Sequence, residues 1–186
     1  AALLWGSGNV AQLTVLKDIG PLAAMGLRCL VAAAVILPFV IREGLPRLGD
    51  GREALKLMLL TSFSFAAAST IMQIAYGHTT VTNAGFLVNT TTVMMPFTAW
   101  LLLRQRPAFL VWPAGLTTLA GAFLMSGGGV SQFNAGDMLC LLSAVFFTLW
   151  MLFLGEFVMK FGSAGLLSLV QFAMTAAICL MLSTAI

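Results

Sequence analysis

Charge is scarce in this sequence, since only 8% of its 186 residues are Asp, Glu, Lys or Arg. A soluble domain of this size carries roughly 25% charged residues, because its surface must face water. Hydrophobic residues make up 60% of the chain, and the mean hydropathy is +1.03. The net charge of +3 is too small to indicate a nucleic-acid partner. The composition therefore predicts an integral membrane protein that is surrounded by the lipid bilayer.

The residue types that carry most catalytic and metal chemistry are also few. His78 is the one histidine, and Cys29, Cys140 and Cys179 lie in apolar runs at spacings that indicate neither a disulfide framework nor a metal site. Intramembrane proteases and lipid hydrolases need a nucleophile with a base, a pair of acids or a metal ion. No acid lies deep in any predicted span. We therefore expect no enzyme activity, no cofactor and no bound metal.

Long apolar runs dominate what is present. A helix needs about 20 apolar residues to cross about 30 Å of hydrocarbon. The runs lack the strict alternation of barrel strands and are about twice as long as such strands. They predict an all-α multi-span helical bundle, with a first span that is short and has no initiator Met before it, as in a clipped N-terminus. The predicted spans are about 1–16, 20–41, 55–76, 84–103, 108–126, 136–155 and 164–186.

Basic residues are unevenly distributed between the loops. Loops after the second, fourth and sixth spans hold seven Lys and Arg residues, and the loops after the first, third and fifth hold only Lys17. Cytoplasmic loops of membrane proteins carry the excess of Lys and Arg. We therefore predict a multi-pass protein of the cell (cytoplasmic) membrane with a cytoplasmic N-terminus, and with His78 and Gly128 outside. The seven residues are Arg42, Arg47, Arg52, Lys56, Arg104, Arg106 and Lys160.

A weak internal repeat relates the first two spans to the last two. Residues 2–5 align with 144–147, and residues 28–34 align with 171–177. A second copy that begins at span six leaves five spans in each repeat, and an odd number of spans inverts the copy in the membrane. We predict a first five-helix repeat over 1–126 and the first two helices of an inverted second repeat over 134–186. That makes seven of an expected ten spans, so we expect the chain to be a fragment.

Several short motifs follow one another in an order and spacing that match a known family. They are Leu4-Trp5-Gly6-Ser7, Pro21-Leu22 with Leu27-Arg28, residues 37–43, residues 79–87, residues 101–107 with Trp112, residues 126–129 and residues 134–137. Together they resemble the EamA-type permeases of the drug/metabolite transporter superfamily. The resemblance implies a ten-helix bundle of two inverted repeats that moves small metabolites across the cytoplasmic membrane. The chain departs from the family at Gln105, where an acid is usual, and at Gly8-Asn9, where an aromatic residue is usual.

Polar residues within the predicted spans are candidates for the substrate path. A charged side chain at the centre of a membrane costs about 2.5–3.5 kcal/mol on insertion scales, so an intramembrane arginine must face polar partners or water. Amides can bind polar substrates, but they also join helices through hydrogen bonds worth about 0.6 kcal/mol on average. Both roles stay open for each residue. The candidates are Arg28 and the amides Asn9, Gln12, Gln73, Asn89 and Gln171.

Asp137 is the acidic residue that most suggests a role in proton coupling. It stands three residues after Asn134 at the predicted start of span six, which is the spacing of a capping box. An acid is also favoured at a helix N-terminus by the helix dipole. We therefore interpret Asp137 as a helix cap.

These features together predict a secondary transporter, a permease that moves small metabolites by alternating access between two inverted repeats. The alternative is a non-transporting membrane scaffold or sensor with the same fold. Small four-helix multidrug transporters fit poorly, because they rely on an acid inside span one, which this chain lacks. The expected partners are a small-molecule substrate and the bilayer, and a homo-oligomer is left open.

Overall fold

The computed structural model describes residues 20–43, 51–104, 106–125 and 134–185 of the chain. All regular structure in these ranges is helical, so the prediction of an all-α bundle is confirmed. Five stretches are long and apolar enough to cross a membrane: Pro21–Arg42, Gly51–Ala75, Asn83–Leu102, Ala135–Phe161 and Ala164–Thr184. The predicted first span lies outside the described residues. The helices are α2 (Pro21–Glu43), α3 (Gly51–Ala75), α4 (Val81–Val88), α5 (Thr91–Leu103), α6 (Val111–Met125), α7 (Ala135–Phe161) and α8 (Ala164–Ala185).

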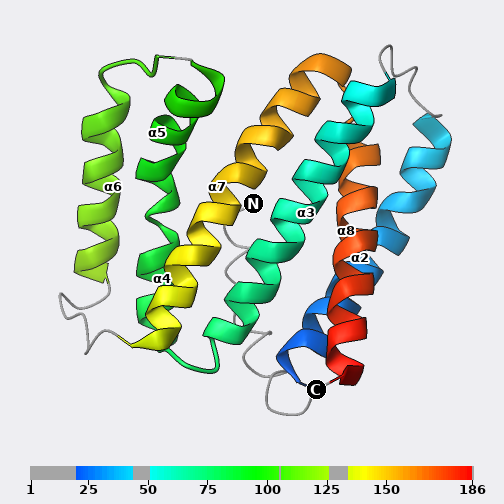
Figure 1. Ribbon diagram of the computed structural model, residues 1–186, viewed down its shortest axis with the longest axis horizontal. Helices are drawn as coiled ribbons and strands as arrows, with labels where there is room; N and C mark the ends of the chain where they lie inside the picture. Colours follow the sequence, from blue (N-terminus) through cyan, green and yellow to red (C-terminus); the bar gives the residue numbers. More distant parts are fainter. Residues whose placement is uncertain (1–19, 44–50, 105, 126–133, 186) are drawn as a thin grey trace.

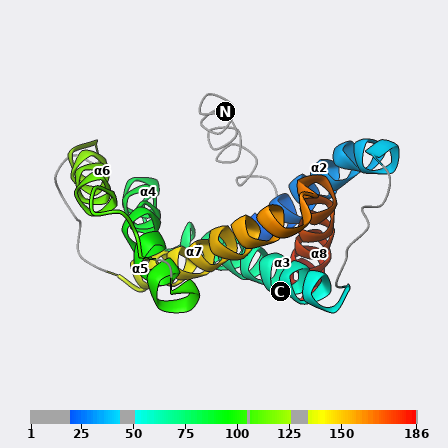
Figure 2. The same ribbon diagram turned by 90° about the horizontal axis from the view of Figure 1, so that it is seen from above.

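The helices divide into two groups that meet at α7 (Figures 1 and 2). In what we call the four-helix unit, α3 packs along α7, α2 packs along α8, and α3 also contacts α8 and α2. In the three-helix unit, α4 and α5 contact α7, and α6 packs against α5 and α4 on the outside. Figure 1 shows α6 at one side of the molecule and the α2–α8 pair at the other.

Small side chains allow the close contacts of the four-helix unit. Ala66, Ala68 and Ala144 are almost fully buried between α3 and its neighbours, and Ser143 Oγ of α7 donates a hydrogen bond of 2.8 Å to the Ala68 carbonyl of α3. At Gly26 a Cβ atom would lie 2.8 Å from Cγ of Leu180, so α2 and α8 also approach closely. Small residues are how helices pack in lipid, where no hydrophobic effect drives them together.

The predicted span 84–103 is interrupted between α4 and α5. Asn89 Nδ2 donates to the Gly85 carbonyl at 2.8 Å, and Thr91 Oγ1 donates to the Val88 carbonyl at 2.8 Å. The backbone N–H of Asn89 then bonds to Phe86 O, a spacing of three residues instead of four. Side chains that hydrogen-bond to nearby carbonyls compete with the helix ladder and bend it. A run of one Asn and three Thr residues therefore produces the break.

Two helices extend beyond the predicted limits into charged segments. The sixth predicted span ends at 155, but α7 continues to Phe161, and Glu156 and Lys160 form an ion pair of 2.9 Å one turn apart on this last stretch. Similarly, α3 starts at Gly51 instead of 55, with Glu53 in its first turn, where an acid suits the helix dipole. In contrast, α6 starts at Val111, three residues later than the predicted span, with Pro113 in its first turn.

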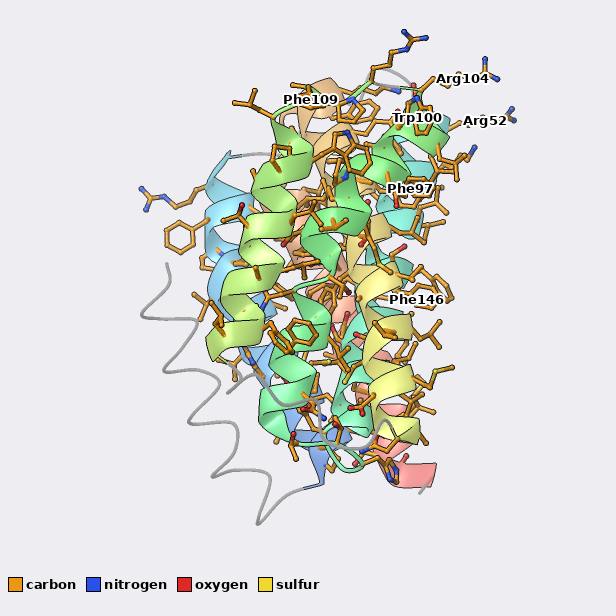
Figure 3. The ribbon with its side chains drawn as sticks, turned by 90° about the vertical axis from the view of Figure 1, so that its left-hand side faces the viewer. Arg52, Phe97, Trp100, Arg104, Phe109 and Phe146 are labelled. Atoms are coloured by element: carbon orange, nitrogen blue, oxygen red, sulfur yellow. The ribbon has the colours of Figure 1, made fainter. Side chains whose placement is uncertain are left out.

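One end of the bundle gathers the basic residues. The C-terminal ends of α2, α5 and α7 and the N-terminal ends of α3 and α8 lie at this end (Figure 1). Figure 3 shows Arg52 and Arg104 there, together with the exposed aromatic side chains Trp100 and Phe109. Lys160 of α7 also reaches Glu53 of α3 at this end. We call it the basic end, and the other the opposite end; the bias of basic residues predicts that the basic end is cytoplasmic.

The opposite end is organised around the start of α7. The backbone N–H of Asp137 donates to Asn134 Oδ1 at 3.0 Å, and the N–H of Asn134 donates to Asp137 Oδ2 at 3.1 Å. This is the capping box predicted from the sequence, which is confirmed. The hydroxyl of Thr79, in the α3–α4 turn, donates to the other oxygen of the Asp137 carboxylate. The buried carboxylate thus joins the start of α7 to the end of α3.

Candidate functional site

A cavity of about 320 Å³ lies between the four helices of the four-helix unit. Its volume is at the lower end of the range for small-molecule sites, which is about 300–1,000 Å³. Every one of α2, α3, α7 and α8 contributes to its wall. The polar lining side chains are Arg28, Ser69, Gln73, Tyr76, Trp150 and Gln171, and the apolar ones are Met25, Cys29, Ala32, Phe65, Met72, Phe147 and Phe172.

The hydrogen-bonding and charged groups lie mainly toward the opposite end. Arg28 is the eighth residue of α2, about 10 Å of helix rise from the start of that helix. Helical side chains lean toward the helix N-terminus, which for α2 is the opposite end. Gln73 stands two residues before the end of α3, and Tyr76 follows that end directly. The guanidinium of Arg28, the amide of Gln73 and the phenol of Tyr76 therefore enter the cavity at similar depths in the membrane.

The deeper wall is aromatic. The ring of Phe65 packs against Trp150, with centroids 5.1 Å apart, and against Phe172 in an edge-to-face contact at 5.7 Å. Trp150 also meets Phe147 at 6.1 Å. Edge-to-face and tilted ring pairs are the favoured geometries of aromatic contacts. The rings come from α3, α7 and α8, so they brace three helices around one side of the cavity.

One hydrogen bond crosses this aromatic wall. Trp150 Nε1 of α7 donates to Gln171 Oε1 of α8 at 2.9 Å. Gln171 is only 3% exposed, so this pairing supplies the partner that a buried amide needs. It also engages the acceptor oxygen of the amide at the cavity wall.

The structure brings together half of the residues predicted for the substrate path. Arg28 of α2, Gln73 of α3 and Gln171 of α8 all line the same cavity, although more than 140 positions separate the first from the last. Gln73 and Gln171 are buried, while the larger side chain of Arg28 is exposed. The contribution of the three residues to transport stays a prediction.

The remaining predicted residues are elsewhere. Asn89 is exposed at the break between α4 and α5, where its amide binds the Gly85 carbonyl, and it is not among the residues that line the cavity. Its visible role is to shape the backbone. Asn9 and Gln12 lie outside the described residues.

Sequence reasoning missed the aromatic part of the cavity. Trp150, Phe65 and Phe172 look like ordinary apolar residues of long hydrophobic spans. One signal is present in the sequence, since tryptophan in membrane proteins is enriched at the interface, whereas Trp150 lies near the middle of its helix. A tryptophan at that depth needs a partner for its N–H, and Gln171 is that partner.

Comparison with known proteins identifies the family. Residues 1–127 match the model of the EamA-like transporter family. An "Uncharacterized transporter" of Archaeoglobus fulgidus is 30% identical over 146 residues, which are 78% of this chain and 44% of that protein. The chain thus spans less than half the length of this relative, and no solved structure matches significantly. Because the family match covers more than half of the chain and agrees with its membrane-spanning helices, the chain belongs to the EamA-like transporter family.

Proposed function

We propose that the protein is a secondary transporter that moves small metabolites through the cavity of the four-helix unit by alternating access. The observation that carries this proposal is the convergence of Arg28, Gln73 and Gln171, from three different helices, on one cavity of metabolite size. Transporters place substrate groups near the middle of the membrane, between their repeats. A chain of a transporter family with such a cavity fits that arrangement.

The helices around the cavity come from both proposed repeats. In the predicted repeat, α2 and α8 are equivalent helices, the second span of each copy, and they run in opposite directions and pack directly on each other. Inverted repeats are related by a pseudo-twofold axis in the membrane plane, so equivalent helices can meet at that axis. The pairing of α2 with α8 therefore supports an inverted repeat with the cavity at its interface.

Side-chain contacts join α7 to α3 at one end of this interface and to the α3–α4 turn at the other. Lys160 binds Glu53 at the basic end, and Thr79 binds Asp137 at the opposite end. In alternating access one repeat rocks against the other around a fixed site. Opening toward the basic end would separate Lys160 from Glu53, and opening toward the opposite end would strain the Thr79–Asp137 contact.

Release of metabolites from liposomes tests the proposal for many candidate substrates at once. The full-length gene product is reconstituted into liposomes loaded with a mixed metabolite extract, and release is followed by mass spectrometry. We expect some metabolites to leave faster than from protein-free liposomes. If no metabolite shows protein-dependent release, the scaffold or sensor alternative replaces the transporter.

A matched pair of substitutions on α2 ties the release to the cavity. Ala32 lines the cavity, so Ala32→Phe should fill part of it and lower the release rate at least tenfold. Ala34 is exposed on the same helix and is not a lining residue, so Ala34→Phe should leave the rate within twofold of the parent. Both proteins are compared at equal amounts of folded protein. Equal rates for the two variants would contradict a path through this cavity.

A further inference from the structure

The charge of the cavity wall selects between classes of substrate. Arg28 is the one ionised side chain among the described residues that line the cavity, and none of these lining residues is an Asp or Glu. A guanidinium keeps its positive charge at every physiological pH. A cation or a zwitterion that entered would therefore meet a positive charge and would find no carboxylate for its ammonium group on the described wall.

The hydrogen-bonding groups add to this preference. The amide oxygen of Gln171 already accepts the Trp150 N–H, and the hydroxyl of Ser69 donates to the Phe65 carbonyl of its own helix. Near the opposite end, Arg28 brings up to five N–H donors in a planar fork that matches a carboxylate. The wall thus offers a charged donor to an anionic group but only neutral acceptors, such as the oxygens of Gln73 and Tyr76, to an ammonium group.

The rest of the wall suits an apolar body. Phe65, Trp150 and Phe172 form a connected cluster of rings, and Met25 of α2 and Met72 of α3 line the cavity nearer the opposite end. Methionine side chains are flexible and polarisable, so they adapt to groups of different shape. Aromatic walls bind flat or branched apolar groups through edge and face contacts.

The geometry points to a substrate class: we propose that the cavity takes small organic monoanions that join a carboxylate to a compact apolar or aromatic body and carry no cationic group. The carboxylate would bind Arg28 near Gln73 and Tyr76, and the body would lie against Phe65 and Trp150. This proposal rests on the proposed function, because it takes the same cavity as the substrate site. It adds the charge, the polarity and the orientation of the substrate.

Four phenyl compounds of nearly equal size test the class. Phenylacetate is an anion, phenylacetamide is neutral, phenethylamine is a cation, and phenylalanine is a zwitterion. Their affinities for the full-length gene product in lipid nanodiscs are measured by calorimetric titration. We expect phenylacetate to bind at least tenfold more tightly than phenylacetamide or phenylalanine, and phenethylamine to show no saturable binding. Equal or tighter binding of phenethylamine or phenylalanine, or no saturable binding of phenylacetate, overturns the proposal.

Substitution of Arg28 tests the assigned orientation. Loss of a hydrogen bond to a charged group typically lowers affinity by about 10- to 100-fold, so Arg28→Gln should weaken the binding of phenylacetate by about that factor. The affinity for phenylacetamide should change by less than threefold, which also shows that the variant is folded. Arg28→Lys keeps the charge but loses the planar fork, so its affinity should lie between those of the parent and Arg28→Gln. Arg42→Gln, in the last turn of the same helix, should have no effect. An equal loss for phenylacetate and phenylacetamide would contradict a role for the charge.

Binding and flux separate this inference from the proposed function. Arg28-dependent binding of phenylacetate without release of any metabolite from liposomes would support the site and its class but would contradict transport. Protein-dependent release that is confined to cationic metabolites would support transport and overturn the monoanion class. Release of carboxylates that is lost in Arg28→Gln would support both.

Discussion

The four-helix unit and the three-helix unit use their polar side chains differently. In the first, local bonds such as that of Ser69 occur beside bonds that cross between helices, from Ser143 to the Ala68 carbonyl and from Trp150 to Gln171. In the second, Thr98, Thr117 and Thr118 donate to carbonyls one turn back on their own helix. A hydroxyl that is satisfied locally costs little in lipid, whereas one that binds across helices holds a particular arrangement.

Burial follows the same division. In α3 (Gly51–Ala75), 61% of an apolar stretch of 18 residues is buried within the structure. The corresponding share is 11% for Asn83–Leu102, which covers most of α4 and α5. The polar, closely packed unit is also the one that holds the cavity. The comparison indicates that specific tertiary contacts define the site, whereas the outer helices depend mainly on local sequence. Substitutions in both units test this division.

Glycine substitutions should give the largest contrast. A Cβ at Gly136 would lie 2.6 Å from the backbone carbon of His78, so Gly136→Ala must move the α3–α4 turn away from α7. Overpacking of this kind costs about 1–3 kcal/mol or more. At Gly121 on α6 a Cβ meets nothing within 4 Å, and Ala there should be neutral or stabilising by up to about 1 kcal/mol, because Ala favours helices over Gly. Thermal unfolding of both variants in detergent is the measurement; similar midpoints would contradict the division.

Loss of a helix cap should have the second largest effect on stability. Asp137→Ala removes the capping bond to Asn134 and the partner of the Thr79 hydroxyl, and a buried network of this kind is worth about 1–3 kcal/mol. Thr80→Ala removes the bond that Thr80 accepts from the Asn83 N–H at the start of α4, which should cost about 1 kcal/mol or less. Unfolding by denaturant compares the two. An Asp137→Ala protein as stable as Thr80→Ala would show that the junction contributes nothing beyond a local cap.

Removal of either of two matched hydroxyl groups should change stability by a smaller amount. Ser143→Ala removes a buried interhelical bond, which averages about 0.6 kcal/mol in membrane proteins. Thr118→Ala removes a bond within α6 at an exposed position and should change stability by less than the error of the measurement. Steric trapping or reversible unfolding in mild detergent has the necessary resolution. A larger loss for Thr118→Ala would reverse the expected order.

The ion pairs at the basic end should have the smallest effect. Lys160 contacts Glu53 and Glu156, but its side chain is 42% exposed, so water and salt screen both contacts. Lys160→Gln should lower the unfolding midpoint slightly at low ionic strength and not at high ionic strength. Lys56→Gln, an exposed residue on α3, is the control. A loss for Lys160→Gln that does not depend on salt would mean that Lys160 acts through packing.

Much of the fold follows from the sequence, because the length and polarity of apolar runs are constraints that lipid imposes directly. Asp137 is recognisable as a cap, since its spacing from Asn134 is a local signal. The break at Asn89 is not predictable from hydropathy, which does not show that side chains replace backbone bonds. Arg28, Gln73 and Gln171 can be nominated one by one from the cost of polar groups in lipid. Their meeting in one cavity depends on packing between distant helices, which no local pattern contains.

Water access to single cysteines shows whether the path runs through the four-helix unit. In a background without native cysteines, Gln73→Cys on the cavity wall and Thr118→Cys on the exposed face of α6 are treated with a charged, membrane-impermeant thiol reagent. We expect Gln73→Cys to react when the reagent is added on either side of the membrane, and Thr118→Cys to stay unmodified in lipid. An unreactive Gln73→Cys beside a reactive Thr118→Cys would contradict such a path.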